Sequence, residues 1–155
     1  KTAKGEQRMM NYESLADGGF ASGSMMGSGG FIVLDDTQCV VKHTYTLARF
    51  YRHESCGQCS PCREGTGWME KILLKIDSGK GSMSDIDLLW DIQRKIEGNT
   101  ICPLGDAAAW PVAAAIRHFR DEFEWHINNP EDCLRKNYGL AGYADEIHVP
   151  VLSNE

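Results

Sequence analysis

Residues 56–62 read Cys-Gly-Gln-Cys-Ser-Pro-Cys and place three thiols within seven positions. A loop this tight can wrap three sulfurs around one metal centre while backbone N–H groups face the same centre. Gly57 relieves steric crowding in the turn, and Pro61 restricts it. We therefore expect Gly57 and Gln58, inside the loop, and Arg63, directly after it, to contact the bound group.

A fourth ligand has to come from elsewhere in the chain. Cys102 is the candidate, because it follows the third predicted helix and the end of that helix can meet the start of the second at one end of a bundle. A cubane [4Fe–4S] cluster is the favoured occupant, since structural zinc sites with four cysteines usually pair two Cys-x-x-Cys motifs. Zinc remains the alternative. The predicted ligands are Cys56, Cys59, Cys62 and Cys102.

The other two of the six cysteines, Cys39 and Cys133, lack metal-site spacing and are expected to be partly buried thiols. His53 is expected to be an ordinary helix-end histidine. Two roles stay open for Arg63: offsetting the negative charge of a cluster, or pairing with a carboxylate. Trp68 and Trp110 are expected to pack in the core.

Apolar residues recur with helical spacing from Val41 onward. Ser78 to Gly81 ends a second helix, and Ser84 with Asp87 three positions later indicates the start of a third. Pro111 is expected in the first turn of a fourth helix, which Asn128 to Pro130 would end. The apolar stripes are Val41, Tyr45, Ala48, Tyr51; Trp68, Ile72, Leu73, Ile76; Ile86, Leu89, Trp90, Ile96; and Val112, Ala115, Ile116, Phe119, Phe123, Ile127.

These patterns predict a mainly α chain, a small bundle of about four helices with the metal group at one end. A Gly-rich segment precedes the bundle, and its apolar run Phe31–Leu34 reads as one short buried β-strand. The predicted organisation is a junction over 1–38, which ends a preceding domain, a helical domain over 39–128, and an extended tail over 129–155. The chain begins without Met, so a fragment of a longer protein is expected.

Composition excludes several classes of function. The 155 residues include 16 basic and 22 acidic side chains, a net charge of −6, which argues against a nucleic-acid surface. The longest nearly apolar run, 107–116, is far shorter than the ~20 residues of a membrane span. No serine-histidine-aspartate order, paired-carboxylate motif or His-x-x-x-His is present, so we predict no catalytic residue.

Two segments together resemble a known family. They are Glu54-Ser-Cys-Gly-Gln-Cys-Ser-Pro-Cys-Arg-Glu-Gly-Thr-Gly-Trp68 and Thr100-Ile-Cys-Pro-Leu-Gly-Asp-Ala-Ala-Ala-Trp-Pro111. They resemble the NADH-oxidising flavoprotein subunit of respiratory complex I, and related modules of NAD-linked hydrogenases and formate dehydrogenases, over about residues 9–125. The resemblance implies a C-terminal helical domain in which Cys56, Cys59, Cys62 and Cys102 ligate a [4Fe–4S] cluster.

The resemblance also implies a function, electron transfer from flavin to further clusters within NADH:quinone oxidoreductase. FMN and NAD are expected only in an upstream domain, because nothing here matches its Gly-rich motifs, and Gly27–Gly30 precedes a strand rather than opening a helix. The chain alone is therefore not expected to be active. The implied partners are a thioredoxin-like iron–sulfur subunit and a large multi-cluster subunit. The implied location is cytoplasmic, peripheral to the inner membrane. The alternatives are a zinc-stabilised interaction module and the equivalent hydrogenase subunit.

Overall fold

The computed structural model describes residues 30, 32–34 and 38–129. Contacts divide the chain after Asp35 into two units. In the first unit, the described residues 30 and 32–34 form no strand, so the expected strand at Phe31–Leu34 is wrong there. Its residues are not buried either, since Ile32 and Val33 are 71% and 91% exposed. The physical reason is that a strand needs a neighbour to pair its backbone groups.

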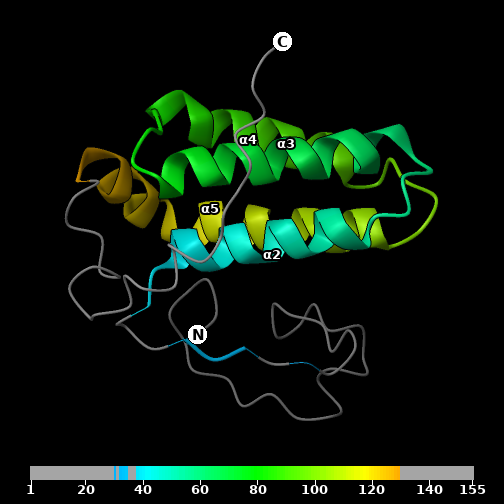
Figure 1. Ribbon diagram of the computed structural model, residues 1–155, viewed down its shortest axis with the longest axis horizontal. Coiled ribbons are helices and arrows are strands. Elements are labelled where there is room, and N and C mark those ends of the chain that lie inside the picture. The colour runs from blue at the N-terminus through cyan, green and yellow to red at the C-terminus, as the bar shows by residue number, and fades with distance from the viewer. Residues whose placement is uncertain (1–29, 31, 35–37, 130–155) are drawn as a thin grey trace. The chain divides into compact units, whose positions relative to one another are not determined.

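The second unit is a bundle built from four helices within residues 38–129 (Figure 1). Consecutive helices run in opposite directions, so each connection reverses the chain at one end of the bundle. This confirms the prediction of a mainly α domain with about four helices. The helices are α2 (Val40–Glu54), α3 (Ser60–Asp77), α4 (Met83–Ile96) and α5 (Leu104–Asn128).

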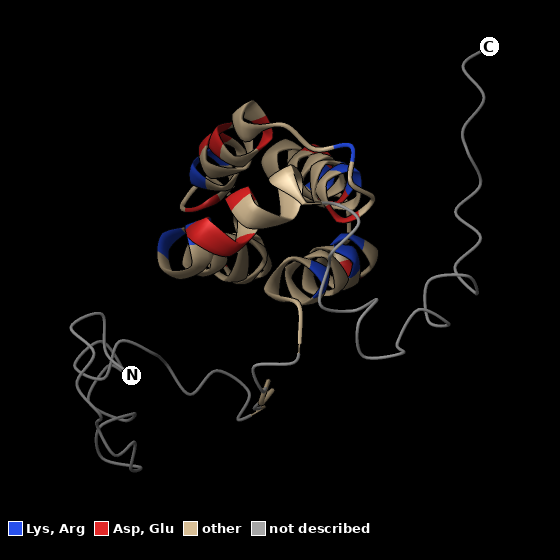
Figure 2. Ribbon diagram, turned by 90° about the vertical axis from the view of Figure 1, so that its left-hand side faces the viewer, with Lys and Arg blue, Asp and Glu red and all other residues tan. Residues whose placement is uncertain are grey.

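All four helices contribute to one hydrophobic core, because each carries an apolar stripe at helical spacing. Figure 2 views the helices end-on and shows Lys, Arg, Asp and Glu around the outside of the bundle. Each large aliphatic side chain buried here contributes about 1.5–3 kcal/mol to stability. The main core residues are Val41 and Tyr45 from α2; Met69, Leu73 and Ile76 from α3; Ile86, Leu89, Ile92 and Ile96 from α4; and Ala108, Val112, Ile116 and Phe123 from α5.

The N-cap of α4 is Ser82, two residues before the predicted capping residue Ser84. Ser82 and Asp85 form the capping box, and Asp85 Oδ2 accepts hydrogen bonds from the Ser82 backbone N–H at 2.7 Å and from its hydroxyl at 2.8 Å. A serine followed three positions later by an aspartate occurs at 82–85 as well as at the predicted 84–87. Burial distinguishes the two patterns. Asp85 is buried and forms an ion pair with Lys75, whereas Asp87 is exposed and pairs with Arg120.

The prediction for Pro111 is wrong, because α5 begins at Leu104 and Pro111 lies in its interior. Buried small residues on both sides, Ala108 and Val112, continue one apolar stripe across the proline. The helix instead departs from helical geometry at Phe119, with φ −136° and ψ 29°. Phe119 is 43% exposed there and so drops out of the predicted stripe. Among the described residues, no helix combines the length and apolarity that a bilayer crossing requires.

Candidate metal centre

Both segments with predicted ligands lie at the same end of the bundle (Figure 1). The α2–α3 connection carries Cys56 and Cys59, and the α4–α5 connection carries Cys102. The two connections approach closely, since the Ile101 backbone N–H donates toward Cys59 Sγ with an N–S distance of 3.5 Å. The prediction that these helix ends meet is therefore confirmed, and the contact places the residue before Cys102 beside the triplet.

The four thiols differ in burial and form no disulfide. Cys62 is buried, with 7% of its surface exposed, while Cys59 is half-buried and both Cys56 and Cys102 are exposed. Cys59 is the N-cap residue of α3, and Cys62 lies in its first turn. A helix N-terminus carries partial positive charge, which complements the negative charge of a metal group held by cysteines. Cys102 comes one residue before Pro103, the N-cap of α5, so it also lies close to a helix N-terminus.

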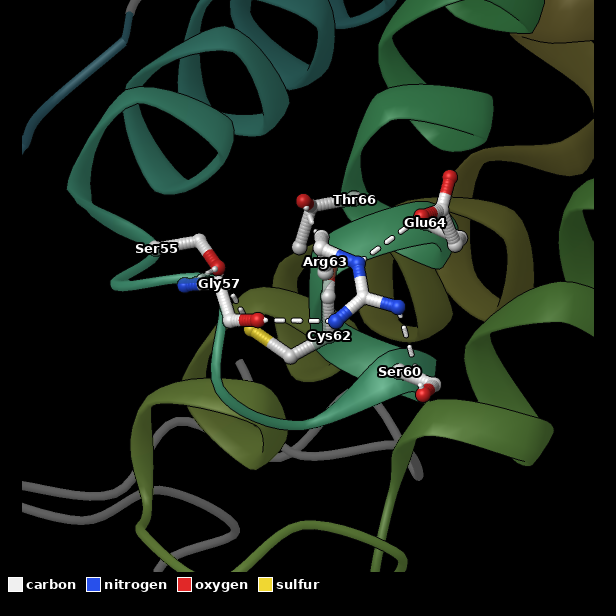
Figure 3. Close-up of polar contacts among 7 residues, drawn as sticks. All are labelled: Ser55, Gly57, Ser60, Cys62, Arg63, Glu64 and Thr66. Carbon is white, nitrogen blue, oxygen red and sulfur yellow. Dashed lines mark hydrogen bonds and ion pairs between the residues drawn. The ribbon is translucent and has the colours of Figure 1, made fainter.

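Arg63 fixes the shape of the cysteine loop (Figure 3). Its guanidinium reaches back from α3 and donates to the Gly57 carbonyl at 3.0 Å and toward Ser60 Oγ at 3.4 Å. The same guanidinium forms an ion pair with the Glu64 carboxylate at 2.9 Å. Of the two roles that stayed open for Arg63, the structure therefore shows the pairing with a carboxylate. Gly57 has φ +79°, a left-handed backbone conformation that residues other than glycine rarely adopt. Gln58, beside it, has an exposed side chain.

Ser55 is a site residue that sequence reasoning missed. Its Oγ lies 3.2 Å from Cys62 Sγ and accepts a hydrogen bond from the Gly57 N–H at 3.3 Å (Figure 3). On the other side of Cys62, the Thr66 hydroxyl donates to the Cys62 carbonyl at 2.8 Å. The only signal in the sequence is a hydroxyl residue directly before the triplet. Ser55 is the C-cap of α2 and Cys62 lies in α3, so the periodicity of a single helix does not relate them.

Three polar contacts hold the α4–α5 connection. Thr100 Oγ1 donates to the Cys102 carbonyl at 3.0 Å, and the Gly98 N–H donates to Asp106 Oδ1 at 2.7 Å. Trp110 Nε1 donates to Glu97 Oε1 at 2.8 Å. Because these bonds link the connection to α5 and to the end of α4, the backbone around Cys102 has a defined position although its side chain is exposed.

The predicted core role of the two tryptophans is wrong, since Trp68 is 54% and Trp110 is 40% exposed. Trp110 lies outside the core because its indole N–H is bound to Glu97, an exposed residue. Trp68 lines a groove of about 610 Å³ between α3 and α4, together with Pro61, Leu88 and Ile92.

The donor set fits an iron–sulfur cluster better than a single zinc ion. Four thiols are soft ligands of the kind that iron–sulfur clusters take, and they come from two segments in contact. Within the described residues, no three Cys, His, Asp or Glu side chains are close enough together for one metal ion. Structural zinc sites with four cysteines usually pair two Cys-x-x-Cys motifs, whereas this donor set is a triplet plus a single cysteine.

Cys39 is half-buried, as expected, and lies at the opposite end of α2. Its Sγ is 3.7 Å from Nδ1 of His126, a residue of the last turn of α5. The fifteen residues of α2 span about 22 Å, which separates Cys39 from the triplet. His53 is highly exposed and contacts Glu54 at 3.0 Å, in agreement with an ordinary helix-end role. Cys133 lies outside the described residues.

Residues 42–126 match the family described as the NADH-ubiquinone oxidoreductase-F iron-sulfur binding region. The chain is 46% identical over 132 residues to the F subunit of NADH-quinone oxidoreductase of Rickettsia typhi, an alignment that covers 85% of this chain and 28% of the relative. It is 44% identical over 126 residues to an F subunit of NADH-quinone oxidoreductase of Rhizobium meliloti, with 81% and 28% covered. The chain therefore spans less than a third of the length of these relatives.

The structure is also similar to a solved structure, that of NAD+-reducing [NiFe]-hydrogenase in the air-oxidized state. The TM-score is 0.59 and the sequence identity is 35%, with 61% of this chain and 17% of the hydrogenase chain covered. The motifs at 54–68 and 100–111 indicated both kinds of relative, the NADH-oxidising subunit of complex I and the related module of NAD-linked hydrogenases.

Proposed function

The chain belongs to the family of NADH-ubiquinone oxidoreductase-F iron-sulfur binding regions, and from that premise we propose that Cys56, Cys59, Cys62 and Cys102 hold its [4Fe–4S] cluster. The observation that carries this assignment is the 3.5 Å contact between the Ile101 N–H and Cys59 Sγ. It joins the triplet to the segment of the fourth thiol, and further support comes from the match of both ligand segments to the family, since 56–62 and 102 lie within residues 42–126.

The residues of this chain would perform three tasks. The four thiolates bind iron, and the N-termini of α3 and α5 offset the negative charge that collects there. Arg63 holds the loop in shape through the Gly57 carbonyl. Buried Cys62 keeps one side of the site away from water. When bound, a cluster of this type accepts and releases one electron at a time, within a range of roughly −700 to +450 mV.

We further propose that the chain acts within an NADH dehydrogenase, as the electron-transfer part of its NADH-oxidising flavoprotein. This proposal is supported by two relatives, which are F subunits of NADH-quinone oxidoreductases and are 46% and 44% identical to this chain. Hydride oxidation would occur at a flavin outside this chain. The electrons would then pass to clusters of a thioredoxin-like iron–sulfur subunit and a large multi-cluster subunit, at the periphery of the inner membrane.

The assignment is tested by loading the full chain with iron and sulfide under anaerobic conditions. We expect a brown protein with about four irons and four sulfides per chain, and an electron paramagnetic resonance signal on reduction with dithionite. A colourless protein that takes up one zinc ion per chain and no iron would overturn the assignment in favour of a zinc-stabilised interaction module.

A second candidate context is a soluble NAD-linked hydrogenase, which the similarity at TM-score 0.59 to a hydrogenase chain supports. The higher sequence identity to the NADH-quinone oxidoreductase relatives favours the quinone-reducing complex. Purification of the complex from its native source distinguishes the two. Co-purification of quinone-reductase subunits is expected, and nickel-containing hydrogenase subunits in their place would establish the second context.

A further inference from the structure

We propose that Ser55 is a positioning residue that raises the reduction potential of the bound cluster by donating a hydrogen bond to Cys62 Sγ. The inference rests on the proposed function, because it requires Cys62 to be a ligand. Ser55 is not itself a ligand candidate and lies outside the Cys-x-x-Cys-x-x-Cys pattern.

The direction of the hydrogen bond follows from the chemistry of a ligand. Ser55 Oγ and Cys62 Sγ are 3.2 Å apart, within the range for a hydrogen bond to sulfur. Either atom can donate while Cys62 is a thiol. A metal-bound thiolate has no proton, so the Ser55 hydroxyl becomes the donor. Cys62 is 7% exposed, and water therefore competes little for its sulfur.

The surrounding contacts orient the Ser55 hydroxyl toward the sulfur (Figure 3). The Gly57 N–H donates to Ser55 Oγ at 3.3 Å and occupies an acceptor site of that oxygen. Arg63 holds the Gly57 carbonyl at 3.0 Å and so fixes the residue that supplies this N–H. The hydroxyl proton is then left to point at Cys62, and donation from Gly57 makes the hydroxyl a stronger donor.

The effect on potential has a definite sign. Reduction adds negative charge to the cluster and its sulfurs, and a donor to sulfur stabilises this charge more in the reduced state than in the oxidised state. Removal of the donor should therefore shift the midpoint potential to a more negative value. Burial of Cys62 makes the shift larger than for an exposed ligand such as Cys56.

The test compares variants that differ only by the hydroxyl. Ser55→Thr keeps it, Ser55→Val has nearly the same shape as threonine without it, and Ser55→Ala removes it with less bulk. Each full chain is loaded with cluster, its iron is counted, and its midpoint potential is measured by anaerobic titration monitored by electron paramagnetic resonance. Ser78→Ala is the control, because it removes an exposed serine hydroxyl at the other end of α3, where Ser78 donates to the Lys75 carbonyl at 3.0 Å.

We expect more negative midpoint potentials for Ser55→Val and Ser55→Ala at full iron content, with Ser55→Thr and Ser78→Ala close to the wild type. Equal potentials for the valine and threonine variants at full iron content would overturn the inference. It is also overturned if both hydroxyl-free variants fail to bind iron while threonine binds it, since Ser55 then serves assembly. Absence of a [4Fe–4S] signal from the wild-type chain would instead refute the proposed function.

Discussion

The backbone N–H of Ile101 lies 3.5 Å from Sγ of Cys59, although forty-two positions separate the two residues. The Ile101 side chain is 83% exposed, so apolar burial of this side chain does not hold the segment in place. Hydrogen bonds at Thr100, Gly98 and Trp110 hold it instead. This relationship makes the approach of Cys102 to the triplet depend on polar contacts that single substitutions can remove.

The first prediction concerns the fourth ligand. Cys102→Ala should remove or degrade the cluster, because only three thiolates remain at the bundle end. Ligand binding to the folded state alone raises its stability, and that gain should disappear. We expect at most trace iron, and an unfolding temperature no higher than that of the iron-free wild type. Full iron content with wild-type stability would show that Cys102 is not a ligand.

The second prediction concerns Cys39, which is about 22 Å along α2 from the triplet end. Cys39→Ala should leave the iron count and the visible absorption spectrum unchanged. Its small effect on stability should come from the lost contact with His126 at 3.7 Å. A loss of iron in this variant would mean that the ligand set is wrong.

The third prediction concerns Gly105, which packs against Thr100. A Cβ at position 105 would lie 2.3 Å from Thr100 Oγ1 and 2.6 Å from its Cγ2, so Gly105→Ala must displace the threonine. Because Thr100 binds the Cys102 carbonyl, the displacement reaches the ligand segment. We expect a stability loss of about 1–3 kcal/mol in chemical denaturation, typical of overpacking, and faster loss of iron to a chelator.

Gly67→Ala is the matched control for this variant. A Cβ there would meet only Arg52 atoms, the nearest at 3.7 Å, which is ordinary contact. Alanine also favours the helix over glycine by about 1 kcal/mol, so this variant should be neutral or more stable than the wild type. A similar loss of stability in both glycine variants would contradict the steric explanation.

The fourth prediction concerns the loop clamp. Arg63→Lys keeps the charge but cannot reproduce the fork that reaches Gly57 and Ser60 together. One hydrogen bond contributes about 1 kcal/mol, so iron loss to a chelator should be roughly fivefold faster. Arg120→Lys is the control, since Arg120 makes exposed ion pairs with Asp87 and Glu124. Equal rates for both variants would leave Arg63 without a role at the loop.

The fifth prediction is a pH dependence at Asp85. Burial alone would raise the pKa of Asp85, but hydrogen bonds from Lys75 and Ser82 outweigh it and hold the pKa below its usual value. A lowered pKa stabilises the fold above the unfolded-state value of about 3.9 and loses this contribution as pH falls through the folded-state pKa.

Asp85→Asn should therefore destabilise the chain at pH 7 by about 1 kcal/mol, a moderate value because Lys75 is 47% exposed. The difference from the wild type should shrink as pH falls below about 4. Denaturation of both proteins across this pH range provides the measurement. A difference that stays constant with pH would show that the carboxylate charge is not the source.

The sequence predicted the helices and the meeting of the two ligand segments because both follow from short-range patterns. The stripe from Val41 to Ala48 and the ending at Ser78–Gly81 agree with the structure. Alternation of four helices then places the residues after α2 and after α4 at one end. The ligand set itself stays a prediction until iron is counted.

Most of the errors have a common physical origin, because they depended on contacts between residues that are not neighbours in the sequence. Two overlapping patterns competed for the cap of α4, and the Lys75 contact selects Asp85. Trp68 follows the helical stripe in the sequence, yet it borders the groove beside Leu88. Proline is typical of a first helical turn, so Pro111 indicated a helix start, whereas α5 begins seven residues earlier at Leu104. Ser55 escaped notice because its contact with Cys62 crosses a loop.

Every helix of the described bundle contributes to the hydrophobic core, and of the four thiols of the site only Cys62 is buried. The order of biogenesis follows from this arrangement. We expect the bundle to fold and set its helix ends before iron is bound, so that the cluster is installed on a surface that is already shaped. Iron and sulfide then need access only to that one end, where Cys56 and Cys102 are exposed to solvent.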